Sequence, residues 1–565
     1  MVSPTDLKAQ GNALFGAENF AEAEKKYTLA IEATDEATDS KELAVLLANR
    51  AACRLSLQRY MDADADAKKA TNLDPTYAKA YARLATAQDR MGVFHLSKES
   101  WKHALDALPE GELKSAEQVQ KTQYEAGLEA ATAALIKLQN TVVGDNAPDK
   151  GLSVTRGEGR MPWDLAAAIV PRLRTQRPTV TSPELFSSAW VIKAAYEDFM
   201  NGVGLMKQLQ FVGQGTERRL VGMHGALAAL TNGIMRDSRV MHIPDNDFIS
   251  KYNKQVAFEA NRFKPWIESG PEVVIQEALT RQRNEGWDAT RPALSITVRY
   301  LNFEMFPAEF DKLICSAWIM QGILDSGVYQ RHHAAVESFK NCLTVIRTLR
   351  EHWILESKED RGAILEKSFE FGVQQLYLEA LMKSYSDGDD STEVLEDLFK
   401  ESDLLICEID EALRQSRSTE PADPGFVSSF YIYPKGEAYA MKGFYYNKRA
   451  MKSGDDRGLF HKSALEYMLA AMSFPQDDEK HPWYLHAAFS SMMNSHAFPL
   501  REALDVMKQI RESAPTANEI WERSALSACG VMAIYRNAAK KEQQLRDMVA
   551  AGKASLDDRM GIEYH

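Results

Sequence analysis

Small apolar residues recur at a fixed spacing through the first hundred residues of the chain. Within each of three trios, neighbouring members are separated by 12 and then 7 residues, and the second and third trios lie 34 residues apart. A repeat of this length is typical of paired antiparallel helices, which cannot bury their apolar faces alone and therefore stack. The trios are Gly11, Ala23 and Ala30; Ala51, Ala63 and Ala70; and Ala85, Ser97 and Ala104.

The trios define where each helical hairpin begins. Counting back from them places the repeat starts near Pro4, Ala44 and Ala78, so the first repeat carries six extra residues around "ATDSKE", which we expect to lie in a loop. Large residues such as Tyr27 fall between the small ones and would fill the gap to the next hairpin. A run of good helix formers over 111–139 is expected to cover the last repeat. The pattern predicts a superhelix whose concave groove is lined by the first helix of each pair.

Helical periodicity also dominates the rest of the chain. Residues 141–163 interrupt it, because they are rich in Gly, Asp, Asn and Pro, and we interpret them as a linker. We therefore divide the chain into a repeat domain with its covering helix (1–140), this linker, a helical region of unassigned type (164–305) and degenerate helical hairpins (306–565). The predicted fold is all-α, with three N-terminal repeats followed by a larger, irregular, solenoid-like helical region.

Degenerate hairpins in the last part show the N-terminal spacing again. In "FHKSALEYMLAAMSFP" Ala464 and Ala471 are 7 residues apart, and the preceding helix is expected to place Gly443 at a close-packing position. In "PLREALDVMKQIRESAP" the spacing recurs, and Pro515 is expected to end the unit. Two other stretches give weaker expectations. "ALSITVRYLNF" is the best candidate for a strand, and acidic runs such as "PQDDEKHPW" are expected to mark solvated loops and helix starts.

Composition limits the possible environments and partners. Hydrophobic residues make up 45% and charged residues 26% of the chain, as in soluble globular proteins, and the net charge of −13 argues against a general affinity for nucleic acid. The 5 cysteines are scattered and form no C-x-x-C pair, so we expect neither disulfides nor a zinc site. The sequence has no apolar run long enough for a membrane span. We predict a cytoplasmic protein, with the nucleus not excluded and no membrane partner.

Five polar residues share the face that should line the groove. Lys79 and Arg83 are positions 2 and 6 of the third repeat, Asn49 is position 6 of the second, and Lys8 and Asn12 are positions 5 and 9 of the first. Positions that differ by three, four or seven lie on one face of a helix. Lysine and arginine supply charge-assisted hydrogen bonds and asparagine supplies neutral donors, a set suited to carboxylates. The groove is therefore predicted to bind a peptide C-terminus whose own carboxylate lies next to an acidic side chain.

Residues 4 to about 111 resemble the tetratricopeptide-repeat co-chaperones that carry a two-carboxylate clamp. The resemblance implies that the groove binds the C-terminal Glu-Glu-Val-Asp of the seventy- or ninety-kilodalton heat-shock chaperones. It also implies that Lys8, Asn12 and Asn49 hold the terminal carboxylate. By the same resemblance Lys79 would hold that carboxylate together with the aspartate side chain, and Arg83 would hold an upstream acidic group.

Beyond the repeats the sequence offers no motif for chemistry. The glycine-containing stretch 201–219 lacks both a preceding strand and G-x-x-x-x-G-K-[ST], and neither G-x-S-x-G nor H-E-x-x-H occurs. We predict no catalytic residue, no metal site and no cofactor. The leading hypothesis is a chaperone adaptor whose C-terminal region holds a client, a second protein or another copy of the chain. Two alternatives stay open: a scaffold that binds another acidic C-terminus, and an enzyme with an active site within 164–565.

Overall fold

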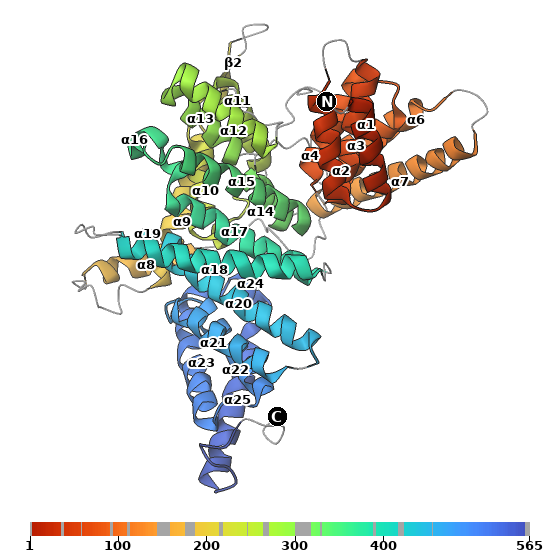
Figure 1. Cartoon of the computed structure of the whole chain (residues 1–565). Coiled ribbons are helices and arrows are strands. Elements are labelled where there is room, and N and C mark those ends of the chain that lie inside the picture. Colours follow the sequence, from red (N-terminus) through yellow and green to blue (C-terminus); the bar gives the residue numbers. More distant parts are fainter. Residues whose placement is uncertain are drawn as a thin grey trace.

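The computed structural model shows a chain built almost entirely from helices, as far as its residues are described (Figure 1). The predicted all-α fold, with N-terminal repeats followed by a larger helical array, is confirmed. The described part of the chain contains no helix that is both long and apolar enough to cross a membrane. The described residues are 3–34, 39–57, 59–90, 94–109, 114–143, 159–175, 187–213, 219–245, 247–263, 270–299, 318–327, 330–387, 391–415, 423–454 and 456–559.

Three hairpins and a covering helix form an N-terminal repeat block, which is red to orange in Figure 1. Each helix packs on the next, and α3 also packs on α5, so the first helices of the second and third hairpins are neighbours. Small residues allow this approach: a Cβ atom added to Gly11 would lie 2.8 Å from the ring of Tyr27. The helices are α1 (Pro4–Gly16), α2 (Phe20–Glu32), α3 (Ser40–Ser56), α4 (Tyr60–Leu73), α5 (Ala78–Arg90), α6 (Phe94–Asp106) and the covering helix α7 (Ser115–Val143).

The extra residues of the first repeat are not all in a loop, contrary to expectation. Helix α3 begins at Ser40, four residues before the repeat start inferred from the sequence. Asp39 caps this early start, because its side chain accepts a hydrogen bond from the backbone N–H of Lys41 at 3.1 Å. Residues 35–38 lie outside the described residues. The insertion thus lengthens α3 by a turn that carries Glu42.

The next helices surround an apolar core that includes Ile192, Phe199 and Leu230. Between α9 and α10 the chain forms a short antiparallel hairpin, which the sequence interpretation missed; Phe211 pairs with Leu220. The predicted strand at 293–303 is wrong up to residue 299, which ends a helix; residues 300–303 lie outside the described part. The elements are α8 (Pro162–Thr175), α9 (Ser188–Met206), β1 (Gln210–Val212), β2 (Arg219–Val221), α10 (Ala226–Arg236), η3 (Ser238–Val240), α11 (Phe248–Phe263), α12 (Pro271–Glu285) and α13 (Trp287–Arg299).

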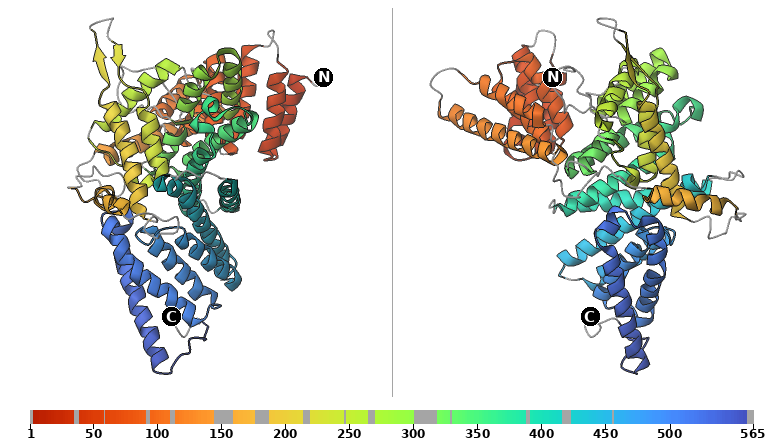
Figure 2. Two further views of the ribbon diagram at one scale, coloured as in Figure 1. Left: turned by 90° about the vertical axis from the view of Figure 1, so that its left-hand side faces the viewer. Right: turned by 180° about the vertical axis from the view of Figure 1, so that it is seen from behind.

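The remaining helices continue as an irregular stack, which Figure 2 shows from two further sides. From α14 to α25 the long helices pack in order, each against the long helices before and after it. The elements are α14 (Trp318–Gly327), α15 (His332–His352), α16 (Lys358–Arg361), η4 (Ala363–Leu365), α17 (Lys367–Ser386), α18 (Thr392–Gln415), α19 (Pro424–Val427), the π-helical turn η5 (Ser428–Ile432), α20 (Tyr433–Lys452), α21 (Arg457–Met472), α22 (Lys480–Ser495), α23 (Leu500–Trp521), α24 (Ala525–Ala528) and α25 (Val531–Ala550).

Helices α20 and α21 reproduce the close packing of the N-terminal hairpins. A Cβ atom at Gly443 would lie 2.9 Å from the ring of Tyr467, so the predicted close-packing role of this glycine is confirmed. Pro515, in contrast, does not end its unit, because α23 continues to Trp521. Ala517 and Trp521 are buried beyond the proline, and their burial offsets the hydrogen bond that proline removes.

One core crosses the predicted boundary near residue 305. Val274 and Leu294 pack in the same cluster as Trp318 and Phe339. The boundary itself lies outside the described residues, as does most of the predicted linker, of which 144–158 are not described. The proposed division of the chain stays a prediction, and α8–α25 are treated below as one body.

The repeat block contacts this body at the start of α4. Helix α4 has no capping side chain of its own, since Arg59 stands at its N-cap. Glu337 of α15 supplies the missing acceptor, because its carboxylate takes a hydrogen bond from the backbone N–H of Tyr60 at 2.9 Å. Arg59 also lies 3.9 Å from the carboxylate of Glu272 on α12. A carboxylate from the body therefore caps a helix of the repeat block.

Candidate functional site

The groove of the repeat block brings three of the five predicted residues into one hydrogen-bonded chain. Asn12 on α1 accepts, through its Oδ1 atom, a hydrogen bond from Nδ2 of Asn49 on α3 at 3.4 Å. The Oδ1 atom of Asn49 in turn accepts from the guanidinium of Arg83 on α5 at 3.2 Å. These residues were predicted to lie on the groove-facing sides of the first helices, and the structure places the three side chains next to one another.

Tyr27 of α2 orients Asn12, at one end of this series of hydrogen bonds. The sequence analysis assigned Tyr27 only a packing role. Its hydroxyl donates to Oδ1 of Asn12 at 2.7 Å. Burial raises the pKa of Tyr27 to about 12, so the hydroxyl stays protonated and remains a donor. Both acceptor contacts of Asn12 are therefore made through its oxygen, which directs its NH₂ group away from Tyr27 and Asn49.

The two lysines of the predicted set are in different situations. Lys79 is exposed on α5, one turn before Arg83, and neither residue pairs with a carboxylate among those described. Lys8 is half-buried on α1, and its Nζ lies 3.6 Å from the carboxylate of Glu42. Glu42 belongs to the insertion and was not among the predicted site residues. No local signal could reveal it, because the contact joins two helices.

The arrangement has the chemistry of a carboxylate-binding groove. The oxygens of the two asparagines accept hydrogen bonds within the protein, and their remaining N–H groups are free of described acceptors. Lys79 and Arg83 add two cations without a described counter-charge. An anionic group entering the groove would meet donors and positive charge from three helices.

Comparison with known proteins gives partial matches of the size of this block. The chain is 33% identical over 120 residues to the heat shock protein STI1 of Saccharomyces cerevisiae, covering 21% of this chain and 20% of that protein. It is 35% identical over 137 residues to the small glutamine-rich tetratricopeptide repeat-containing protein 2 of the same yeast, covering 24% and 36%. With the Hsp70-Hsp90 organizing protein of Triticum aestivum it shares 42% identity over 87 residues, covering 15% and 14%. No protein-family model matches the chain.

The repeat block has the tetratricopeptide-repeat fold and is similar to these relatives. The chain spans only a fifth to about a third of the length of the first two of these relatives. The likeness therefore concerns this tetratricopeptide-repeat domain, while the body needs an account of its own.

A second group of charged residues lies inside the body, in the stretch "PQDDEKHPW". The expectation that this run is solvated is wrong, because Asp478 is fully buried and Glu479 is 8% exposed. Arg239 of η3 is the reason: its guanidinium donates to the carboxylate of Asp478 at 2.9 Å and lies 3.7 Å from the centre of the Trp521 ring. Burial alone would raise the pKa of Asp478, but the adjacent Arg239 outweighs it and holds that pKa below its usual range.

The acidic residues 477–479 also form hydrogen bonds with segments that are distant in the sequence. Asp477 accepts a hydrogen bond from the backbone N–H of Ser188 at 2.8 Å, at the start of α9. Tyr433 of α20 donates to Asp478 at 2.9 Å, and Ser524 donates to Glu479. Arg239 also donates to Asp237 at 2.7 Å. Below, the set of Asp237, Arg239, Asp477, Asp478 and Glu479 is called the buried charge cluster. It joins the first and last parts of the body.

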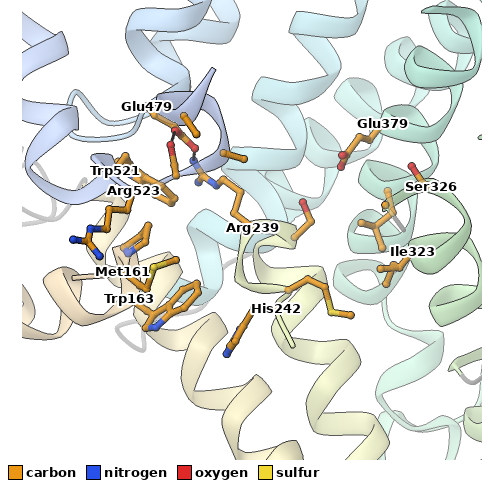
Figure 3. Close-up of a pocket in the computed structure, with 18 of the residues that line it drawn as sticks. Met161, Trp163, Arg239, His242, Ile323, Ser326, Glu379, Glu479, Trp521 and Arg523 are labelled. Atoms are coloured by element: carbon orange, nitrogen blue, oxygen red, sulfur yellow. Dashed lines mark hydrogen bonds and ion pairs between the residues drawn. The ribbon is translucent and has the colours of Figure 1, made fainter. Parts of the chain in front are cut away.

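A cavity of about 550 Å³ borders this cluster (Figure 3). Its labelled residues come from both ends of the body, with Trp163, His242 and Trp521 on one side and Glu379 and Ser326 on the other. Burial lowers the pKa of His242, and its Nδ1 atom lies 2.8 Å from the carbonyl oxygen of Val240.

The charged groups around the cavity largely satisfy one another. Glu379 pairs with Lys383 at 2.7 Å, and Glu479 lies 3.3 Å from Arg239. The cavity has the size of a small-ligand site. The enzyme hypothesis would place its active site here. In the lining, Ser524 donates a hydrogen bond to Glu479, whose carboxylate also pairs with Arg239. Among the described residues there is no group of three or more side chains that could hold a metal ion.

Proposed function

We propose that the protein is a cytoplasmic, protein-binding adaptor of the co-chaperone type. Its tetratricopeptide-repeat groove would bind the acidic C-terminal tail, of the Glu-Glu-Val-Asp type, of a seventy- or ninety-kilodalton heat-shock chaperone. Lys8, Asn12 and Asn49 would hold the terminal carboxylate, Lys79 that carboxylate together with the aspartate side chain, and Arg83 an upstream acidic group.

The observation that carries this proposal is the direction of the hydrogen bonds in the groove. Tyr27 donates to Asn12 at 2.7 Å, and Arg83 donates to Asn49 at 3.2 Å, so both amide oxygens already accept hydrogen bonds and the remaining donors are available to an anion. Two relatives of the repeat domain support the choice of ligand, since they are named as a heat shock protein and as an Hsp70-Hsp90 organizing protein. The affinity should be on the order of micromolar, because a few charge-assisted bonds must offset the ordering of a flexible tail.

Calorimetric titration of the full chain tests the proposal. The probe is a peptide that ends in Met-Glu-Glu-Val-Asp, used as the free acid and with an amidated C-terminus. We expect only the free acid to bind, and we expect Lys79→Ala combined with Arg83→Ala to weaken binding by about a hundredfold, because two charge-assisted contacts are lost. Binding should also weaken at high salt, which screens the ionic attraction.

A matched variant distinguishes the effect of losing the groove cations from the effect of changing the overall charge of the protein. Lys25 on α2 and Lys102 on α6 are exposed cations on the second helices of their hairpins. Changing both to alanine removes the same net charge outside the groove and should leave binding within about twofold of wild type. A folded protein that binds neither peptide, or that binds the amidated peptide equally well, would refute the proposal. Preference for a different acidic C-terminus would favour the scaffold hypothesis.

A further inference from the structure

Glu42 places a carboxylate of the protein itself inside the proposed clamp. It lies in the first turn of α3, in the six-residue insertion that distinguishes the first repeat. Its Oε1 atom is 3.6 Å from Nζ of Lys8, and the two side chains are 39% and 27% exposed, respectively. The pair is therefore open to solvent at the end of the groove formed by α1 and α3.

The pair makes the two ends of the clamp unequal. At one end Lys8 faces a negative charge of the protein, so that this end is close to neutral. At the other end Lys79 and Arg83 have no described carboxylate partner. A ligand carboxylate that approaches Lys8 competes with Glu42 for the same ammonium group, and the two like charges repel each other.

We propose that Glu42 is an internal competitor, a carboxylate that occupies Lys8 in the free protein and is displaced by the terminal carboxylate of the bound tail. The inference rests on the proposed function, since it concerns the same groove. The competitor weakens the clamp and makes its affinity depend mainly on the α5 end. Exposed ion pairs are weak, which keeps the exchange readily reversible. Glu42 would thus lower the affinity of the groove, as a consequence of the insertion.

The test compares wild type with Glu42→Gln, which keeps the shape of the side chain and removes its charge. Titration with the Met-Glu-Glu-Val-Asp free acid should show about two- to tenfold tighter binding to the variant, because Lys8 no longer has a competing partner. Amidation of the peptide should abolish this gain. Glu32→Gln is the matched control: it removes an exposed carboxylate from the end of α2 and should leave the affinity unchanged.

A second measurement examines the pair without any ligand. Limited acetylation by an N-hydroxysuccinimide ester, read by mass spectrometry, reports how readily Lys8 reacts relative to the exposed Lys69 of the same molecule. The ratio should rise in Glu42→Gln and stay constant in Glu32→Gln. An unchanged ratio in Glu42→Gln would show that the ion pair is absent and would overturn the inference.

The two measurements together separate the inference from the proposed function. Increased labelling with equal or weaker tail binding would overturn the competitor role while leaving the adaptor function intact. If neither wild type nor Glu42→Gln binds the tail, the adaptor function is refuted, and the competitor role falls with it. Increased labelling together with a gain that depends on the free carboxylate would support both.

Discussion

The groove of the repeat domain and the buried charge cluster of the body use the same residue types in opposite ways. In the cluster, Arg239 donates to Asp237 and Asp478 at 2.7 to 2.9 Å through all three of its nitrogens. In the groove, Arg83 makes one described hydrogen bond, to the neutral Asn49 at 3.2 Å. A charged group whose donors all meet internal acceptors stabilises the fold, whereas one with spare donors at the surface can bind a ligand.

The largest effect is expected from Arg239→Met, which would break the cluster. The substitution leaves Asp237 and Asp478 buried without their counter-charge, and removal of one partner of a buried pair costs about 3–5 kcal/mol. Urea denaturation followed by tryptophan fluorescence should show this loss in the transition of the body. A loss below about 1 kcal/mol would mean that the two carboxylates are solvated or protonated in the variant.

A smaller loss is expected from Gly443→Ala, which tests whether the body packs like the repeat domain. The new Cβ atom would lie 2.9 Å from the ring of Tyr467. Overpacking of this kind costs about 1–3 kcal/mol, and the better helix propensity of alanine recovers up to about 1 kcal/mol.

Gly204→Ala is the control for this packing test. Gly204 lies in the last turns of α9, and its added Cβ atom would meet no atom within 4 Å. We expect this variant to be stabilised by about 0.5–1 kcal/mol. If thermal unfolding shows the same change for both glycines, close packing does not explain Gly443.

Tyr27→Phe tests whether the Tyr27 hydroxyl orients Asn12 for tail binding. The change removes the hydroxyl that donates to Asn12 at 2.7 Å and keeps the ring that packs against Gly11. Tail binding should weaken by about three- to tenfold, since one hydrogen bond contributes about 0.5–1.5 kcal/mol. Titration of Tyr81→Phe, which removes a hydroxyl from the groove-lining helix α5, should give the wild-type affinity. Equal losses in the two variants would argue against the orienting role of Tyr27.

The smallest effect is expected from Arg414→Met at an exposed ion pair. Arg414 lies 2.8 Å from Glu411, as close as Arg239 lies to its partners, but the two side chains are 71% and 54% exposed. Exposed pairs contribute about 0–1 kcal/mol, and i,i+3 or i,i+4 pairs on helices less than that. Urea denaturation should hardly distinguish this variant from wild type. A loss comparable with that of Arg239→Met would show that distance, and not burial, sets the strength of these pairs.

Much of the fold could be predicted from local patterns. The spacing of small residues located the three N-terminal hairpins, and the same pattern identified Gly443 as the close-packing residue of α20. The hairpin of β1 and β2 was missed because each strand has only three residues and no clear alternation. Pro515 was misread because the burial of residues beyond it lies outside the local pattern.

The candidate site, too, could be predicted only in part. The positions of Asn12, Asn49 and Arg83 on one face followed from helical periodicity, and the structure brings them into contact. The role of Tyr27 and the approach of Glu42 to Lys8 did not follow, because each depends on the position of a second helix.

The sequence by itself determined most of the helical pattern and which residues face the groove, because helical periodicity is a property of neighbouring residues. Only the tertiary structure decided which charges meet. Arg239 and Asp478 are far apart along the chain, and so are Lys8 and Glu42, yet the path of the backbone buries the first pair and leaves the second exposed. Burial and partners set the energy of a charge, and both depend on the assembled fold.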